Sequence, residues 1–101
     1  MAKPLVLYPP PTDPAAFNAY YRVAHLPLAR KIPGVRKIEV STGKIMTQGP
    51  AEYHFVALLS FDSMDALRTS LASPEGQAAA ADIANFATGG ATLVAFQEEE
   101  P

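Results

Sequence analysis

The stretch from Tyr53 to Phe61 constrains the fold of this 101-residue chain more than any other feature. In an extended conformation Val56 and Leu58 lie on one face of this stretch. Phe55 and Leu59 lie on the opposite face, so both faces are apolar. Strands with this pattern are covered on both sides. The stretch therefore predicts a central strand of a sheet with protein packed against each face.

One helical segment is expected before this strand. Asp13 precedes Pro14, and this pair combines a favourable N-cap with a proline at the first helical position. It predicts a helix over residues 14–31. Pro27 removes one backbone donor, so we expect the helix to kink or break just after His25.

A second helical segment is expected after the central strand. Asp62 or Ser63 caps it, and Ser73 starts it again before it ends at Phe86. Three further apolar stretches predict the remaining strands, at residues 3–8, 35–46 and 91–97.

The resulting order β-α-β-β-α-β predicts an α+β fold of the ferredoxin-like type with one four-stranded antiparallel sheet. No linker or repeat is visible, so we expect a single domain over residues 1–101. Two helices cover only one face of such a sheet. Burying a few hundred Å² of the other apolar face, at roughly 25 cal/mol per Å², favours self-association by several kcal/mol. We expect a homodimer whose sheets face each other as an α+β barrel.

The composition excludes several classes of site. The chain has no cysteine, which excludes disulfides, a thiol nucleophile and cysteine metal ligands. It shows neither a secretory leader nor an apolar run of about 20 residues, so we expect a cytoplasmic protein that does not enter a membrane.

The charges are unevenly distributed although the net charge is only -2. Residues 22–44 contain six basic side chains against the single acidic Glu39. Such a segment can draw an anionic small molecule towards the neighbouring helix. It can equally be the solvated surface of a helix and a strand. The basic residues are Arg22, Arg30, Lys31, Arg36, Lys37 and Lys44.

His25 is the candidate for acid/base chemistry. At about 100° per residue it lies at the flank of an apolar helical stripe, one turn after Tyr21. An imidazole at such a boundary can exchange a proton near neutral pH. The alternative is a half-buried histidine with a purely structural role. The stripe consists of Phe17, Tyr20, Tyr21, Ala24, Leu28 and Ile32.

Other chemical motifs are missing. Only His25 and His54 can supply imidazoles, and they lie on different elements. Because neither has carboxylates at ligand spacing, we expect no metal site and no cofactor.

The order of elements along the chain, β-α-β-β-α-β, is shared with RNA recognition motifs. However, only Tyr53, Phe55 and Val56 match their third-strand pattern, so we expect no nucleic-acid partner.

The chain resembles the EthD family of dimeric α+β barrel proteins over nearly its whole length. The motifs that carry the resemblance are Leu7-Tyr8-Pro9, Asp13, Phe17, Tyr20-Tyr21, His25-Leu26-Pro27-Leu28, Ile32-Pro33-Gly34, Phe61-Asp62-Ser63, Ser73-Pro74-Glu75-Gly76, Asp82 and Asn85-Phe86. The resemblance implies a ferredoxin-like protomer, a homodimer and a pocket between helices and sheet. It also implies a link to ethyl tert-butyl ether degradation and a loose grouping with oxidoreductases.

The resemblance places His25 at the histidine of the family pattern, as the general acid/base. We expect Tyr21, Tyr53, His54 and Phe86 to line a pocket for substrate, because they are amphipathic or aromatic. Lactone-isomerising relatives carry polar groups on the strand after Pro-Gly. This chain has Ile38 and Val40 there, which argues against isomerase activity.

Two functions from different classes remain open. One is a small enzyme that acts on a hydrophobic metabolite by proton transfer or cofactor-free oxidation. The other is a non-catalytic protein that holds such a compound for a partner oxygenase. An RNA-recognition-like module is a third, less favoured alternative.

Overall fold

The sheet of the computed structural model, which describes residues 1–101, has four antiparallel strands in the order β2-β3-β1-β4. β3 is a central strand, as predicted from its two apolar faces. The expected ferredoxin-like α+β architecture is therefore confirmed. The strands are β1 (Ala2–Tyr8), β2 (Lys37–Val40), β3 (Phe55–Ser60) and β4 (Thr92–Gln97).

The first helical segment begins as predicted, with Asp13 Oδ1 accepting a hydrogen bond from the Ala16 backbone N–H at 3.1 Å. The expected break at Pro27 takes another form. The Leu26 N–H donates to the Tyr21 carbonyl five residues earlier, which widens the helix into a π-turn just before the proline. Three elements follow one another without a gap: α1 (Pro14–Tyr20), the π-turn (Tyr21–His25) and α2 (Leu26–Arg30).

The π-turn changes which side chains point inwards. The buried residues of this segment are spaced by four, at Phe17, Tyr21, His25 and Ala29. An ideal α-helix drifts away from a spacing of four because it has 3.6 residues per turn, whereas a wider turn preserves this spacing. His25 was expected at the flank of the stripe. It lies within the buried row instead, with 5% of its surface exposed.

The second helical segment also follows the predicted caps. The hydroxyl group of Ser63 accepts from the Ala66 N–H at 3.0 Å, and that of Ser73 accepts from the Gly76 N–H at 3.1 Å. The segment consists of α3 (Met64–Ala72), α4 (Pro74–Asp82) and a short 3₁₀ turn (Ile83–Asn85).

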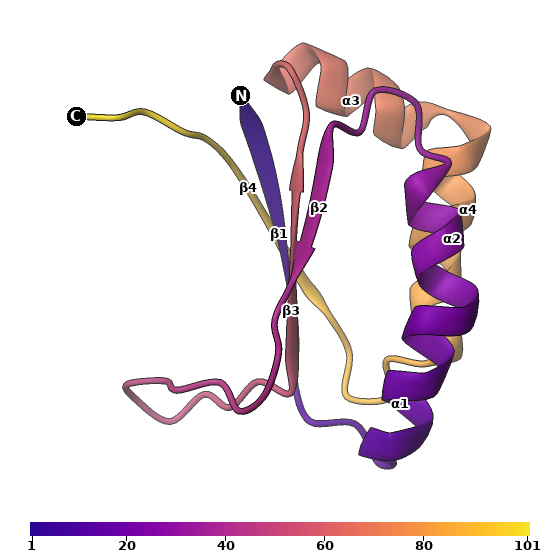
Figure 1. Ribbon diagram of the computed structural model, residues 1–101, viewed down its shortest axis with the longest axis vertical. Coiled ribbons are helices and arrows are strands. Elements are labelled where there is room, and N and C mark those ends of the chain that lie inside the picture. Colours follow the sequence, from indigo (N-terminus) through magenta and orange to yellow (C-terminus); the bar gives the residue numbers. More distant parts are fainter.

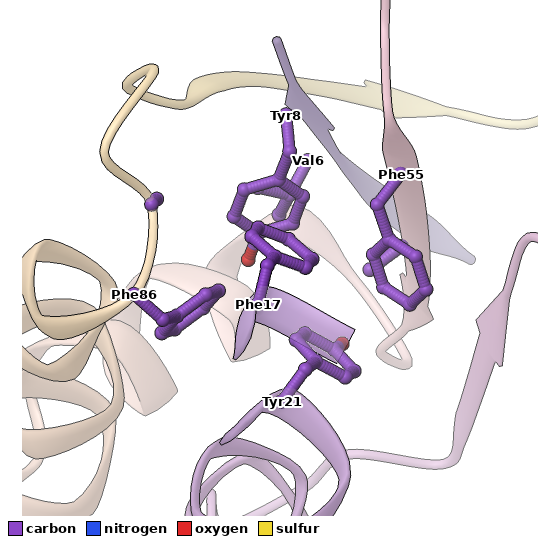
Figure 2. Packing of buried hydrophobic residues seen from close by; sticks show 8 residues of the cluster. Val6, Tyr8, Phe17, Tyr21, Phe55 and Phe86 are labelled. Carbon is purple, nitrogen blue, oxygen red and sulfur yellow. The ribbon is translucent and has the colours of Figure 1, made fainter. Parts of the chain in front are cut away.

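All helices lie on one side of the sheet (Figure 1). Two groups of buried side chains fill the space between the layers. The aromatic group, shown in Figure 2, consists of Val6, Tyr8, Phe17, Tyr21, Phe55, Ala57, Phe86 and Ala87. The smaller group consists of Ala2, Ala29, Ile32, Phe61, Leu67 and Ala79.

The other face of the sheet carries no helix (Figure 1), and its centre is apolar with charged side chains of β1 and β2 around it. Residues of β1 alternate strictly in burial, which places every second side chain on this open face. The cross-strand register puts side chains of β3 and β4 beside them, where Val94 and Phe96 are 46% and 43% exposed. The apolar members of the open face are Leu5, Leu7, Val56, Leu58, Val94 and Phe96.

The expected strand over residues 35–46 is shorter in the structure. The Ser41 N–H still donates to the Val56 carbonyl, but the Val56 N–H donates to the Ser41 hydroxyl at 3.0 Å instead of to a backbone carbonyl, and β2 ends at Val40. Residues 41–54 form a loop, and β3 begins only at Phe55. In Figure 1 this loop extends beyond the sheet on the side away from the helices.

Candidate active site

His25 and Asp82 connect the two helical segments inside the protein. His25 lies on the π-turn, and Asp82 is the last residue of α4. Their Nδ1 and Oδ2 atoms are 3.0 Å apart, and both residues are more than nine-tenths buried. Two ionisable groups thus meet in a buried position, an arrangement that is found at active sites.

Asp82 is held as a carboxylate by its neighbours. Its Oδ1 accepts from the Tyr20 hydroxyl at 2.7 Å and from the Asn85 amide at 3.0 Å. Burial by itself would raise the pKa of this carboxyl group. The hydrogen bonds donated by Tyr20, Asn85 and His25 outweigh that effect and hold the pKa of Asp82 below its usual value.

The imidazole of His25 is neutral at pH 7. Burial lowers the pKa of His25 below 6.5, and the Asp82 carboxylate offsets only part of this effect. Because the carboxylate can only accept a hydrogen bond, the His25 proton is assigned to Nδ1. The lone pair of Nε2 then remains available, since this nitrogen makes no hydrogen bond with the protein.

A small apolar cavity of about 80 Å³ lies beside His25, between the helices and the sheet. Most of its lining is aliphatic or aromatic, and it borders on both groups of core residues. Tyr8 and Tyr21 line it as well, and their hydroxyl groups form no side-chain hydrogen bond in the protein. Nε2 and the two phenols are therefore the side-chain polar groups available to a molecule in this space.

The two phenols are protonated hydrogen-bond donors at any physiological pH. Burial raises the pKa of Tyr21 to about 12, although the charge of Arg22 acts in the opposite direction. Burial raises the pKa of Tyr8 further, and the nearby Tyr21 and Asp82 add to this effect. The residues that carry a neutral base and two donors thus line the same apolar space. That combination can remove a proton and stabilise the oxyanion that results.

The structure separates the sequence-predicted site residues into two places. His25 and Tyr21 line the cavity together. Phe86 packs against the His25 ring at 4.8 Å between centroids but does not line the cavity. Tyr53 and His54 lie instead in an outer groove beside the loop of residues 41–54, where Tyr21 also contributes to the lining.

Sequence reasoning gave no acid/base role to Asp82 or Tyr8. Asp82 ends an alanine-rich helix, where a negative charge opposes the helix dipole, and this unfavourable position was the available signal. Tyr8 fits the alternating burial pattern of β1, so the sequence indicated only that it is a buried residue of a strand. Their roles depend on contacts between distant parts of the chain.

The structure contains no group of three or more histidine, cysteine, aspartate or glutamate side chains placed to hold a metal ion. The expectation that neither metal nor cofactor is needed stays a prediction. Separately, none of the helices is both long and apolar enough to cross a membrane.

The pKa of His25 predicts how stability depends on pH. The unfolded chain takes up a proton near pH 6.5, whereas folded His25 resists protonation until a lower pH. The free energy of unfolding should therefore fall as the pH drops below about 6.5, by roughly 1.4 kcal/mol for each pKa unit of difference between the two states. Urea titrations of the wild type and His25→Asn test this. Equal pH slopes for the two proteins would contradict it.

Comparison with known proteins identifies a family whose sequences and structures are similar to this chain. The EthD domain matches residues 9–90. An uncharacterized 11.0 kDa protein of the thcB-thcC intergenic region of Rhodococcus erythropolis is 40% identical over 100 residues, which cover 99% of this chain and 96% of that protein. A crystal structure of an ethyl tert-butyl ether degradation (EthD) family protein from Bacillus halodurans is 31% identical. It superimposes with a TM-score of 0.88 over 98% of this chain and 99% of that one.

More distant structures share the fold. A dimeric protein with a ferredoxin-like fold from Bacteroides fragilis is 25% identical, with a TM-score of 0.63 over 96% of this chain and 95% of that one. SnoaB, a cofactor-independent oxygenase from Streptomyces nogalater, is 16% identical, with a TM-score of 0.66 over 99% of this chain and 94% of that one. The fold therefore occurs in dimers and in at least one enzyme that works without a cofactor.

Proposed function

This chain belongs to the EthD family, and we propose that it removes a proton from a small hydrophobic molecule with His25 as the general base and without a cofactor. The observation that carries the proposal is the free Nε2 of a neutral imidazole, which borders an apolar cavity while Nδ1 is held by Asp82. Such a buried pair orients the ring and stabilises the imidazolium that forms.

The proposed step uses the three polar groups of the cavity. A C–H bond next to a carbonyl group breaks, its proton moves to Nε2, and its electron pair passes to the carbonyl oxygen. The Tyr8 and Tyr21 hydroxyl groups donate hydrogen bonds to that oxygen. The Asp82 carboxylate balances the new charge on His25.

Dioxygen is the co-reactant that we propose for the second step, because the fold is shared with a cofactor-independent oxygenase. The electron pair of the carbanion forms a bond from carbon to oxygen, which oxidises the carbon and reduces dioxygen to a peroxide anion bound to that carbon. The peroxide anion takes the proton from His25 and becomes a hydroperoxide, and the neutral base is restored.

The first step can be tested without knowledge of the natural substrate. Hydrophobic 1,3-diketones are incubated with the protein in D₂O without oxygen, and exchange of the acidic C–H is followed by NMR. We expect His25→Gln to slow the protein-catalysed exchange about 100-fold or more, as general bases usually do. Asp82→Asn should also slow it, and Asp65→Asn, which changes an exposed carboxylate on α3, should not.

Each variant is checked for folding by circular dichroism before the exchange is measured. If folded His25→Gln exchanges these compounds as fast as the wild type, the catalytic role is wrong. If the wild type binds the diketones but does not accelerate their exchange, the protein is a non-catalytic binding protein instead.

A further inference from the structure

A second hollow lies next to the candidate active site, beside the first helical segment. It is a groove of about 410 Å³ between that segment and the loop of residues 41–54. Ligand sites of small molecules commonly have 300–1,000 Å³. Its lining consists of Asn18, Tyr21, Arg22, Ser41, Thr42, Gly43, Lys44, Ile45, Tyr53, His54 and Phe55.

The groove is positively charged and contains no compensating carboxylate. Arg22 and Lys44 line it, and no aspartate or glutamate does. Neither of the two cations forms an ion pair. Glu52 lies in the adjoining part of the loop but pairs with neither of them. The neighbouring Arg36 and Lys37, by contrast, have acidic partners. The positive charge of the groove is therefore available to an anion from outside.

Neutral hydrogen-bond donors accompany these cations. The Oδ1 atom of Asn18 accepts a hydrogen bond from Nε2 of His54, at 2.8 Å, so the amide orientation is fixed. The amide N–H groups of Asn18 and the hydroxyl group of Thr42 also line the groove and can donate to a bound molecule. Neutral donors next to two cations are typical of a site for an oxyanion.

Tyr21 connects the groove with the inner cavity. It is the one side chain that lines both spaces, and it separates Arg22 on the outside from His25 on the inside. Its ring packs against Phe55 at 4.5 Å and against His25 at 5.2 Å between centroids. A molecule that reaches from the groove past Tyr21 would enter the cavity beside Nε2.

We propose that the groove is the entrance subsite for the anionic head of the substrate, so that the substrate class is a small apolar molecule with a carboxylate or a similar oxyanion. Arg22 and Lys44 bind the head, and the apolar body passes Tyr21 towards His25. The orientation of the substrate, with its apolar body towards His25, rests on the proposed function. The charge of the groove is an independent observation.

Octanoate and 1-octanol are suitable probes because they share a chain and differ in charge. Calorimetric titration at pH 7.5 and low salt should give octanoate at least about fivefold tighter binding than 1-octanol in the wild type. The double variant Arg22→Gln/Lys44→Gln should lose this preference and bind 1-octanol as before. Lys31→Gln is the matched control, because it removes an exposed cation from the end of the same helix and outside the groove.

The outcomes separate this inference from the proposed function. Preference for octanoate that disappears in the double variant and persists in Lys31→Gln supports it. Equal binding of both probes to the wild type, no binding of octanoate, or a preference that survives in the double variant overturns it. His25→Gln reports on proton transfer in the exchange experiment and leaves the charge preference of the groove intact, so either idea can fail without the other.

Discussion

Leu58→Lys is expected to convert the protein from a homodimer into a monomer. Leu58 lies in the middle of the open face, between Leu5 on β1 and Glu39 on β2. Facing sheets would bury this position in both copies, and taking an ammonium group out of water at the centre of such an interface costs several kcal/mol even with Glu39 beside it. Sedimentation velocity at micromolar concentration should give about twice the chain mass for the wild type and the chain mass for the variant.

Val23→Lys is the matched control for this experiment. Val23 is 78% exposed on the π-turn, on the helical side of the protein, so the same substitution there should leave the dimer unchanged. A wild type that sediments as a monomer would refute the dimer. It would also leave the exposure of Val94 and Phe96 without an explanation.

Asp82→Ala is expected to cost about 3 kcal/mol of the free energy of unfolding. The carboxylate accepts hydrogen bonds from Tyr20, His25 and Asn85, and its removal leaves the buried His25 N–H and the half-buried Tyr20 hydroxyl without their partner, whereas the exposed Asn85 can turn to water. Each stranded group costs roughly 1–3 kcal/mol, partly relieved where water can enter. Against a total stability of about 5–15 kcal/mol, the loss is readily measured by urea denaturation.

Two further variants make this result interpretable. Tyr20→Phe removes one donor and keeps the carboxylate, so it should cost only about 1 kcal/mol. Asp65→Ala removes a carboxylate that is 94% exposed and should change the stability by less than about 0.5 kcal/mol. If Asp82→Ala is as stable as Asp65→Ala, the buried network contributes nothing to folding.

Local chemistry made much of the fold predictable. Asp13, Ser63 and Ser73 cap helices in the structure as their positions in the sequence indicated, because capping needs only a side-chain oxygen and the next few backbone N–H groups. The two-sided apolar pattern of residues 53–61 likewise identified a central strand. The first two residues of this stretch, Tyr53 and His54, belong to the loop, because the end of a strand depends on its pairing with the neighbouring strand.

The candidate site was less predictable because its parts meet only after folding. His25 could be chosen from its type and its neighbours, but its partner Asp82 lies 57 residues away. A helical period of 3.6 also placed His25 at the edge of the apolar stripe. The position of the π-turn at Tyr21–His25 is not contained in helical periodicity alone.

The single wide turn in the first helical segment lets one row of side chains serve two parts of the core. Before the turn, Phe17 and Tyr21 belong to the aromatic group of core residues. After it, Ala29 and Ile32 belong to the smaller group. A uniform α-helix would rotate side chains spaced by four progressively away from the sheet, whereas the wide turn keeps them in line. His25 thereby lies between the two groups, beside the cavity that borders on both of them.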